Sequence, residues 1–430
     1  MNDADPVFSE DMLDDYPTSP VPDHRTVGGI RIGMVNGSLA FAVPGLVTGL
    51  ELGGSLGINR SLIAFLLGGI FLAVVGSITG IVGAANRLTS YMLIKFVFGR
   101  NGAKLVNVAF AVALFGWFGV NTDLFSGAAA ELSLQLFGVI PAVWALEIGA
   151  GILITASTLL GFRLLNRMSA VFVPVLFVVI VFLLIRGLDA GTNGLAATLF
   201  DSSMTLGQGI SAVVGSFIVA VVLMPDFTRF ARSKRSAVTA SFLPFLFLST
   251  FVYVAAAIAG SAVAESDALA VMLALGMGFA AFSLLVLSSW IAGVINLYSC
   301  SLCLNSVFTG YAEWRIVVAS GIAGTIAASF NLLESFTTFL FSLAIIFAPI
   351  CGVYVTDFFV FRRGKAYDIA ELESVRSVSV EALLAWAIGT GTAFLSYKSI
   401  FQLTSIEAAD SIIVASLSYY LMGYARRRFS

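Results

Sequence analysis

The chain has 430 residues, of which 59% are hydrophobic and only 11% are charged, with a formal net charge of −2. A water-soluble domain carries about 25% charged residues, so this composition excludes an ordinary soluble protein. Apolar stretches near 20 residues long recur throughout, which is the length an α-helix needs to cross about 30 Å of hydrocarbon. We therefore expect an all-α polytopic membrane protein in contact with the lipid bilayer, with no nucleic acid and no obligate protein partner.

The first 25 residues differ from the rest of the chain. They are acidic and contain several prolines, and they lack the basic start and apolar core of a signal peptide. We expect residues 1–25 to form a disordered cytoplasmic tail.

Charged or turn-rich breaks divide the remaining chain into apolar runs. Twelve transmembrane helices are predicted, at residues 30–56, 61–86, 104–130, 138–160, 164–186, 207–224, 237–264, 269–298, 312–331, 335–360, 380–397 and 408–425. Cytoplasmic loops carry an excess of Lys and Arg, and an inside N-terminus leaves only Arg60, Arg186 and Lys398 on the outer side. The sequence thus predicts a multi-pass protein of the plasma (inner) membrane with both termini in the cytoplasm. Segments 89–98 and 302–309 are predicted to be short interfacial helices.

Two of these spans contain residues that interrupt a helix. Pro44 and Gly45 lie at the middle of the first span, with Glu51 beyond them, and Pro225 lies late in the sixth. Proline removes a backbone donor, and free backbone groups at membrane depth are tolerated only against protein or a water-filled cavity. Interrupted helices five spans apart are typical of transporters built from inverted repeats, with the binding site at the breaks. The alternative is that Pro and Gly are simply commoner in membrane helices than in soluble ones.

Three cysteines lie in or near spans, and Cys300 and Cys303 have the C-x-x-C spacing. The chain has no second such pair, and its one histidine is in the N-terminal tail. Because a zinc site needs four ligands, we expect the cysteines to pack helices. No metal centre and no cofactor are expected, apart from a coupling ion.

Several motifs resemble a known family. "FGWFGV" in the third span, "VVGSFI" and "PDFTRFAR" in the sixth, and "APICGVYVTDFF" in the tenth are similar to the cytosine permease branch of the nucleobase:cation symporter-1 family. The resemblance implies a ten-helix core with a LeuT-like 5+5 inverted repeat at residues 26–360, a cytoplasmic loop at 361–379, and two additional helices with a short basic tail at 380–430. It also implies uptake of a flat nitrogenous ring such as cytosine, a purine or a hydantoin.

The same resemblance implies where that ring binds. Trp117 and Phe217 match the aromatic residues that hold the ring, and Ser216 borders the broken sixth helix. Stacking of a planar heteroaromatic ring contributes about 0.5–1.5 kcal/mol beyond the buried area. The alternative for each aromatic residue is ordinary helix packing.

The sequence departs from the family at two places. Leu114 replaces a glutamine one turn before Trp117, and Ile291-Ala292 replace a Thr-Thr pair that supplies hydroxyls to bound sodium. Backbone carbonyls near Ser38 and Ala42 and the hydroxyl of Ser288 remain as oxygen ligands. This predicts a depleted sodium site.

Polar residues elsewhere in the spans suggest replacements. Asn121 is seven residues after Leu114 and shares its helix face, and Asn296 lies in the eighth span. We expect both to contact the ring edge of a ligand other than cytosine, the alternative being hydrogen bonds that join neighbouring helices. Asp123 and Glu51 are the candidate proton carriers if coupling is to H⁺ instead of Na⁺.

The leading hypothesis is a secondary transporter that imports cytosine or a related nucleobase by cation-coupled alternating access. A second hypothesis keeps the fold but changes the substrate to a hydantoin, a vitamin precursor or another small heterocycle, with proton-coupled or uncoupled transport. An enzyme is disfavoured because the spans contain no histidine and no cluster of catalytic carboxylates.

Overall fold

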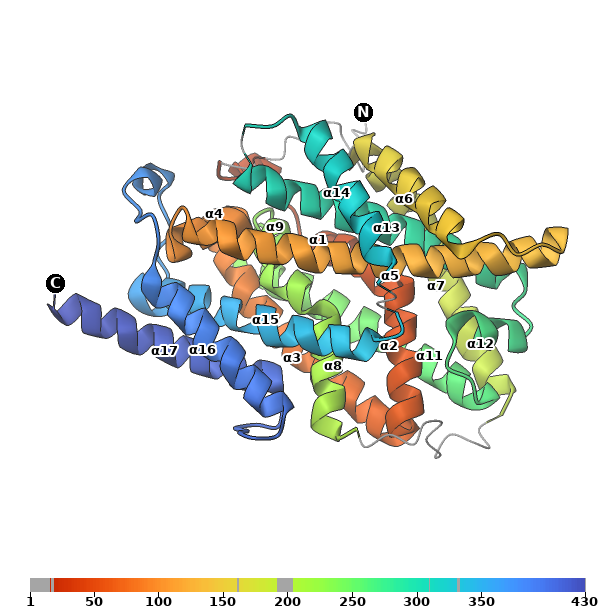
Figure 1. Ribbon diagram of the computed structural model, residues 1–430. Coiled ribbons are helices and arrows are strands. Elements are labelled where there is room, and N and C mark those ends of the chain that lie inside the picture. The colour runs from red at the N-terminus through yellow and green to blue at the C-terminus, as the bar shows by residue number, and fades with distance from the viewer. Residues whose placement is uncertain are drawn as a thin grey trace, which may run out of the picture.

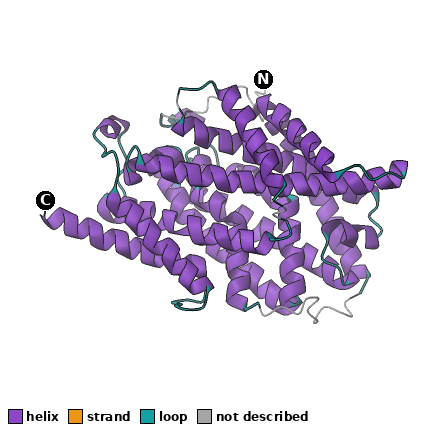
Figure 2. Cartoon of the chain, viewed as in Figure 1, coloured by secondary structure: helices purple, strands orange, loops and turns teal. Residues whose placement is uncertain are grey.

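The computed structural model describes residue 16 and residues 19–160, 162–191, 204–308, 310–330 and 333–429. Within these residues the chain is a bundle of helices (Figures 1 and 2), and the only β pairing is an isolated bridge between Val27 and Ala231. Most of the predicted N-terminal tail lies outside the described residues.

Helix occupies each of the twelve predicted ranges. The α-helices are α1 (Gly29–Gly37), α2 (Val43–Leu56), α3 (Ile58–Asn86), α4 (Ser90–Phe98), α5 (Gly102–Phe137), α6 (Val143–Leu159), α7 (Phe162–Asp189), α8 (Leu206–Val222), α9 (Met224–Thr228), α10 (Lys234–Phe242), α11 (Ser249–Val263), α12 (Ala268–Ala274), α13 (Phe279–Val307), α14 (Glu313–Ala328), α15 (Phe336–Thr356), α16 (Val380–Tyr397) and α17 (Glu407–Phe429). Shorter turns are η2 (Asp23–Arg25), η3 (Ser38–Phe41), η4 (Leu243–Leu248), η5 (Asp357–Phe361) and η6 (Ile369–Glu373).

The structure corrects two boundaries. The predicted eighth span is two helices, because Gly276 and Gly278 take positive φ values of 72° and 48° between α12 and α13. Helix α13 then continues to Val307, so the separate interfacial helix predicted at 302–309 was wrong. The other predicted interfacial helix coincides with α4.

By length and apolar composition, five helical segments of the described chain are able to cross a membrane, and α1 with α2 makes a sixth. Many large apolar side chains on the outside of the bundle are exposed, among them Ile152, Val112 and Ile322. A water-facing surface would not carry them in such numbers, so the chain is a multi-pass membrane protein.

The first span is broken where the sequence places its Pro-Gly pair. The two halves of the span are bent by 61°, and Ala42 between them has extended backbone. Pro44 lies in the first turn of α2, where its missing N–H costs nothing. A Cβ on Gly45 would lie 2.9 Å from the carbonyl oxygen of Ala40. The break is therefore confirmed, but Pro44 begins the second half instead of interrupting the middle of a helix.

The end of the predicted tail is packed on the bundle. Val21 is 1% exposed and its N–H donates to the carbonyl of Arg87 at 3.1 Å, while Asp23 forms an ion pair with the Arg87 side chain. The disordered segment predicted for residues 1–25 therefore does not extend over these residues.

The last two helices, α16 and α17, pack against α15 at one edge of the bundle (Figure 1, blue). Asp410, fully buried, joins them by accepting hydrogen bonds from the Ser396 hydroxyl at 2.7 Å and the Thr404 N–H at 2.8 Å. The loop before them holds Arg362 in an ion pair with Glu371.

Candidate functional site

The predicted site residues lie mainly on four helices that meet around α2. Helix α2 begins directly after the first break, and it packs against α5, α8 and α13. Helix α5 carries Trp117 and Asn121, α8 carries Phe217, and α13 carries Asn296. The fold thus brings most of the candidate residues to one region beside a break.

Trp117 is 8% exposed, at about the middle of α5. Its ring meets Phe336 and Phe339 of α15 edge to face, at centroid distances of 6.1 and 5.2 Å. The start of α15 therefore covers this region.

Phe217 is 9% exposed on α8, and its ring lies 5.7 Å from that of Phe245 in η4. The two candidate platforms contact different aromatic rings, so they do not stack on each other. Ser216 lies inside the regular part of α8, and its hydroxyl is bonded to Val213 and, at 2.7 Å, to Tyr253. The prediction that Ser216 borders the break was wrong, because α8 continues to Val222.

The sixth span is interrupted at Leu223, two residues before Pro225, which begins the short helix α9. Because proline has no N–H, the carbonyl of Val221 has no partner four residues further on. The Thr79 hydroxyl of α3 donates to it at 2.8 Å, and the Tyr354 hydroxyl of α15 donates to Val222 at 2.9 Å. Sequence reasoning missed both residues, because each lies more than 130 positions from its partner.

Loss of the Tyr354 hydroxyl should destabilise the protein. Tyr354→Phe leaves the Val222 carbonyl buried without a partner, which costs about 1–3 kcal/mol. A lower midpoint of thermal unfolding in detergent measures the effect. Tyr397→Phe is the matched control, since that hydroxyl has no hydrogen bond among the described residues; equal midpoints for the two variants would contradict the role of Tyr354.

Asn121 is completely buried, one turn beyond Trp117. Its Nδ2 donates to the backbone carbonyl of Trp117 at 2.6 Å, while its Oδ1 has no hydrogen-bond partner among the described residues. Only an N–H can bond to a carbonyl, so the chemistry fixes Oδ1 as the unused atom. The amide therefore binds its own helix, not a neighbouring one. Leu114 is buried in the apolar core, and Asn296 on α13 is half-buried.

The residues predicted for a sodium site are already engaged locally. The Ser38 and Ser288 hydroxyls donate to carbonyls in their own segments, at 2.7 and 2.5 Å. The Ala42 carbonyl accepts the N–H of Gly45 at 2.9 Å. Ile291, at the position of a family threonine, packs in a second apolar cluster with Phe118 and Ile154.

One further polar group at this place escaped the sequence analysis. The Ser289 hydroxyl, next to Ser288, is fully buried without a partner in the described part of the chain. Its signal was weak, because a single serine in a membrane helix usually bonds to its own backbone.

The two candidate proton carriers differ. Glu51 on α2 is half-buried, and no acidic or basic side chain faces it. Both carboxylate oxygens of Asp123 on α5 are enclosed without a hydrogen-bond partner. Facing it are the carboxylates of Glu147 on α6 and Glu334 before α15, and the backbone of Leu333 at a geometry short of a hydrogen bond. Asp123 thus faces away from Trp117, as predicted.

Polar pairs elsewhere differ from expectation. Asp357, expected to pair with Arg362, instead accepts hydrogen bonds from Tyr367 and Tyr419. Asp226 accepts the N–H of Ser90 at 2.7 Å, at the start of α4. The three cysteines are buried, and the Cys303 thiol donates to the Tyr91 hydroxyl at 3.0 Å, in keeping with helix packing.

Comparison with known proteins decides the family. The model of a family described as permeases for cytosine/purines, uracil, thiamine and allantoin matches residues 20–421. The chain belongs to this family. It is therefore a membrane transporter and not an enzyme.

Two relatives show the range of the family. The chain is 27% identical to the cytosine permease of Escherichia coli (strain K12) over 413 residues, which is 95% of this chain and 94% of that one. It is 24% identical to the hydantoin permease of Microbacterium maritypicum over 349 residues, 73% of this chain and 70% of that one.

The fold is that of a solved transporter. Mhp1, a nucleobase-cation-symport-1 family transporter, matches with a TM-score of 0.82 in a closed conformation with bromovinylhydantoin bound, covering 97% of this chain and 96% of that one at 19% identity. Its inward-facing conformation matches with a TM-score of 0.83 at 17% identity, covering 99% of this chain and 96% of that one.

Proposed function

We propose that this permease imports a small planar heterocycle with a ring N–H, most simply cytosine or a related nucleobase, by alternating access across the plasma membrane. Asn121 is the observation that carries the proposal. Its Oδ1 is buried, unpartnered and one turn from the Trp117 ring. An unpaired buried acceptor is costly, and a ring N–H from a substrate on Trp117 would satisfy it.

The proposed site consists of Trp117 and Phe217 against the ring faces and Asn121 at one edge. Asn296 would meet the opposite edge, since α13 packs along α5. Ser216 supports α8 through its bond to Tyr253. The wider architecture of twelve spans, with a 5+5 inverted repeat and both termini in the cytoplasm, belongs to the same proposal. It is supported by the helix in all twelve predicted ranges and by the excess of basic residues on one side.

A competition experiment tests the substrate class. Cells expressing the protein would take up radiolabelled cytosine while uracil, purines, hydantoins, thiamine precursors and their N-methylated forms compete. Methylating the N–H that meets Asn121 should weaken competition roughly tenfold or more, because Oδ1 is then left unpaired. In Asn121→Leu this discrimination should disappear. If no nitrogenous ring is transported or competes, the proposed function is wrong.

Coupling to protons is the second part of the proposal. The hydroxyl pair of the family sodium site is Ile291-Ala292 here, and Ile291 is packed among apolar side chains. Sodium needs several oxygen ligands, whereas a proton needs one carboxylate. An isolated buried carboxylate is expensive to keep ionised, and Asp123 has two acids facing it and no hydrogen-bond partner. These features support Asp123 as the group that binds and releases the coupled proton.

A further inference from the structure

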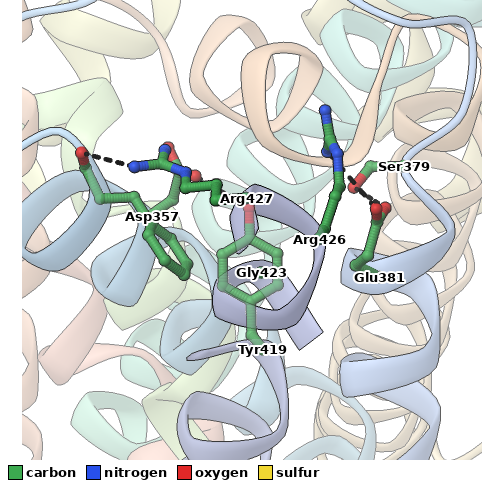
Figure 3. Close-up of a pocket in the computed structure, with 8 residues that line it drawn as sticks. Asp357, Ser379, Glu381, Tyr419, Gly423, Arg426 and Arg427 are labelled. Atoms are coloured by element: carbon green, nitrogen blue, oxygen red, sulfur yellow. Dashed lines mark hydrogen bonds and ion pairs between the residues drawn. The ribbon is translucent and has the colours of Figure 1, made fainter. Parts of the chain in front are cut away.

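A small cavity lies where η5, the start of α16 and the end of α17 meet (Figure 3). Its volume is about 110 Å³, which is room for a group the size of a phosphate. Its walls include the charged side chains of Asp357, Glu381, Arg426 and Arg427. The cavity is at the end of the bundle that the basic residues assign to the cytoplasm.

The two acids in the walls are already occupied. Asp357 accepts the Tyr419 hydroxyl on one oxygen at 2.8 Å and the Tyr367 hydroxyl on the other at 2.6 Å. Burial and the adjoining Asp357 carboxylate raise the pKa of Tyr367 well above its ordinary range, so this phenol keeps its proton and remains a donor. One oxygen of Glu381 faces both Arg376 and Arg426, each at 3.4 Å.

Arg427 has no acidic partner among the described residues. Its guanidinium lies 4.5 Å from the centre of the Phe361 ring and donates one hydrogen bond, at 3.5 Å, to the Phe361 carbonyl. Stacking holds the planar group in place, and most of its five N–H donors remain available. Such a group suits bidentate binding of a phosphate.

The surface beside the cavity is apolar and aromatic. Tyr420, Leu421 and Tyr424 of α17 are 39%, 55% and 53% exposed. Tyr420 stacks on Phe361 at 6.1 Å, so aromatic side chains run from the outer face of α17 to Arg427. Tyrosine is enriched at the level of lipid headgroups, and acyl chains would lie along the apolar face of α17 below it.

We infer that this cavity holds the phosphodiester of an anionic phospholipid, with Arg427 as its main ligand and Arg426 beside it. Basic pockets between membrane helices on the cytoplasmic side are suited to such headgroups. The lipid would join α15, α16 and α17, and would thereby stabilise the attachment of the last two helices to the transport core.

Binding can be measured on the purified full-length protein in detergent by native mass spectrometry and by thermal unfolding. Phosphatidylglycerol should bind and raise the unfolding midpoint, whereas phosphatidylcholine should not. Arg427→Gln should weaken phosphatidylglycerol binding roughly fivefold or more, from the loss of one cation at the headgroup. Arg428→Gln removes the same charge one residue further on, outside the cavity walls, and should weaken binding about twofold at most.

Other outcomes would overturn the inference. Equal losses in the two arginine variants would indicate diffuse attraction to a basic surface. Equal stabilisation by inorganic phosphate would assign the cavity to a free anion instead of a lipid. If Arg427→Gln fails to fold, Glu381→Gln decides: it removes a competing acid and should tighten phosphatidylglycerol binding, so unchanged or weaker binding would count against the site.

Discussion

Replacing Trp117 by alanine should abolish measurable uptake while leaving the protein folded in the membrane. The substitution removes the stacking surface and its buried area, which together cost about 2–3 kcal/mol, or roughly a 30- to 150-fold loss of apparent affinity. Trp117→Phe keeps a smaller ring and should lose only about fivefold. Initial rates of radiolabelled uptake across a substrate concentration series, normalised to surface expression, measure both variants.

Trp144→Ala is the control for Trp117→Ala. That tryptophan is 67% exposed near the start of α6, away from Trp117 and its ring contacts. Its loss should leave substrate affinity unchanged. Normal transport by Trp117→Ala would refute the stacking role and leave Trp117 as a packing residue against Phe336 and Phe339.

The positions of the helix breaks could be predicted from the sequence because their cause is local. Proline lacks an N–H, and this alone places an interruption close to Pro44 and to Pro225. In each case the structure puts the break two residues earlier, since proline is favoured in the first turn of the helix that follows. The same local rule misplaced Ser216, because α8 stays regular until the proline forces it to end.

The groups that stabilise the second break could not be predicted in this way. Thr79 and Tyr354 come from helices far along the chain, and one hydroxyl in an apolar helix carries no signal of the carbonyl it will meet. The same holds for the cavity around Arg427, whose walls combine η5, α16 and α17. Helical periodicity did place Leu114, Trp117 and Asn121 on one face, but only the fold shows that the Asn121 amide is half used.

The strongest test of proton coupling is Asp123→Asn, which keeps the shape of the side chain and removes the exchangeable proton. One proton moving down a potential of about 100 mV supplies roughly 2.3 kcal/mol, enough for about 50-fold accumulation of substrate. The variant should therefore bring the steady-state ratio of inside to outside substrate close to one. Binding should survive, because Asp123 faces Glu147 and Glu334, away from the Trp117 ring.

Uptake by the unaltered protein should persist when choline replaces sodium, rise at lower external pH and collapse with a protonophore. Glu131→Gln is the matched control, since it removes a carboxylate from the same helix whose partner is Gln135, and it should accumulate substrate normally. Strict sodium dependence would show instead that Ser288, Ser289 and the Ala42 carbonyl assemble an ion site despite Ile291. Accumulation retained in Asp123→Asn, with protons still required, would move the coupling role to Glu51, the other half-buried carboxylate of the candidate region.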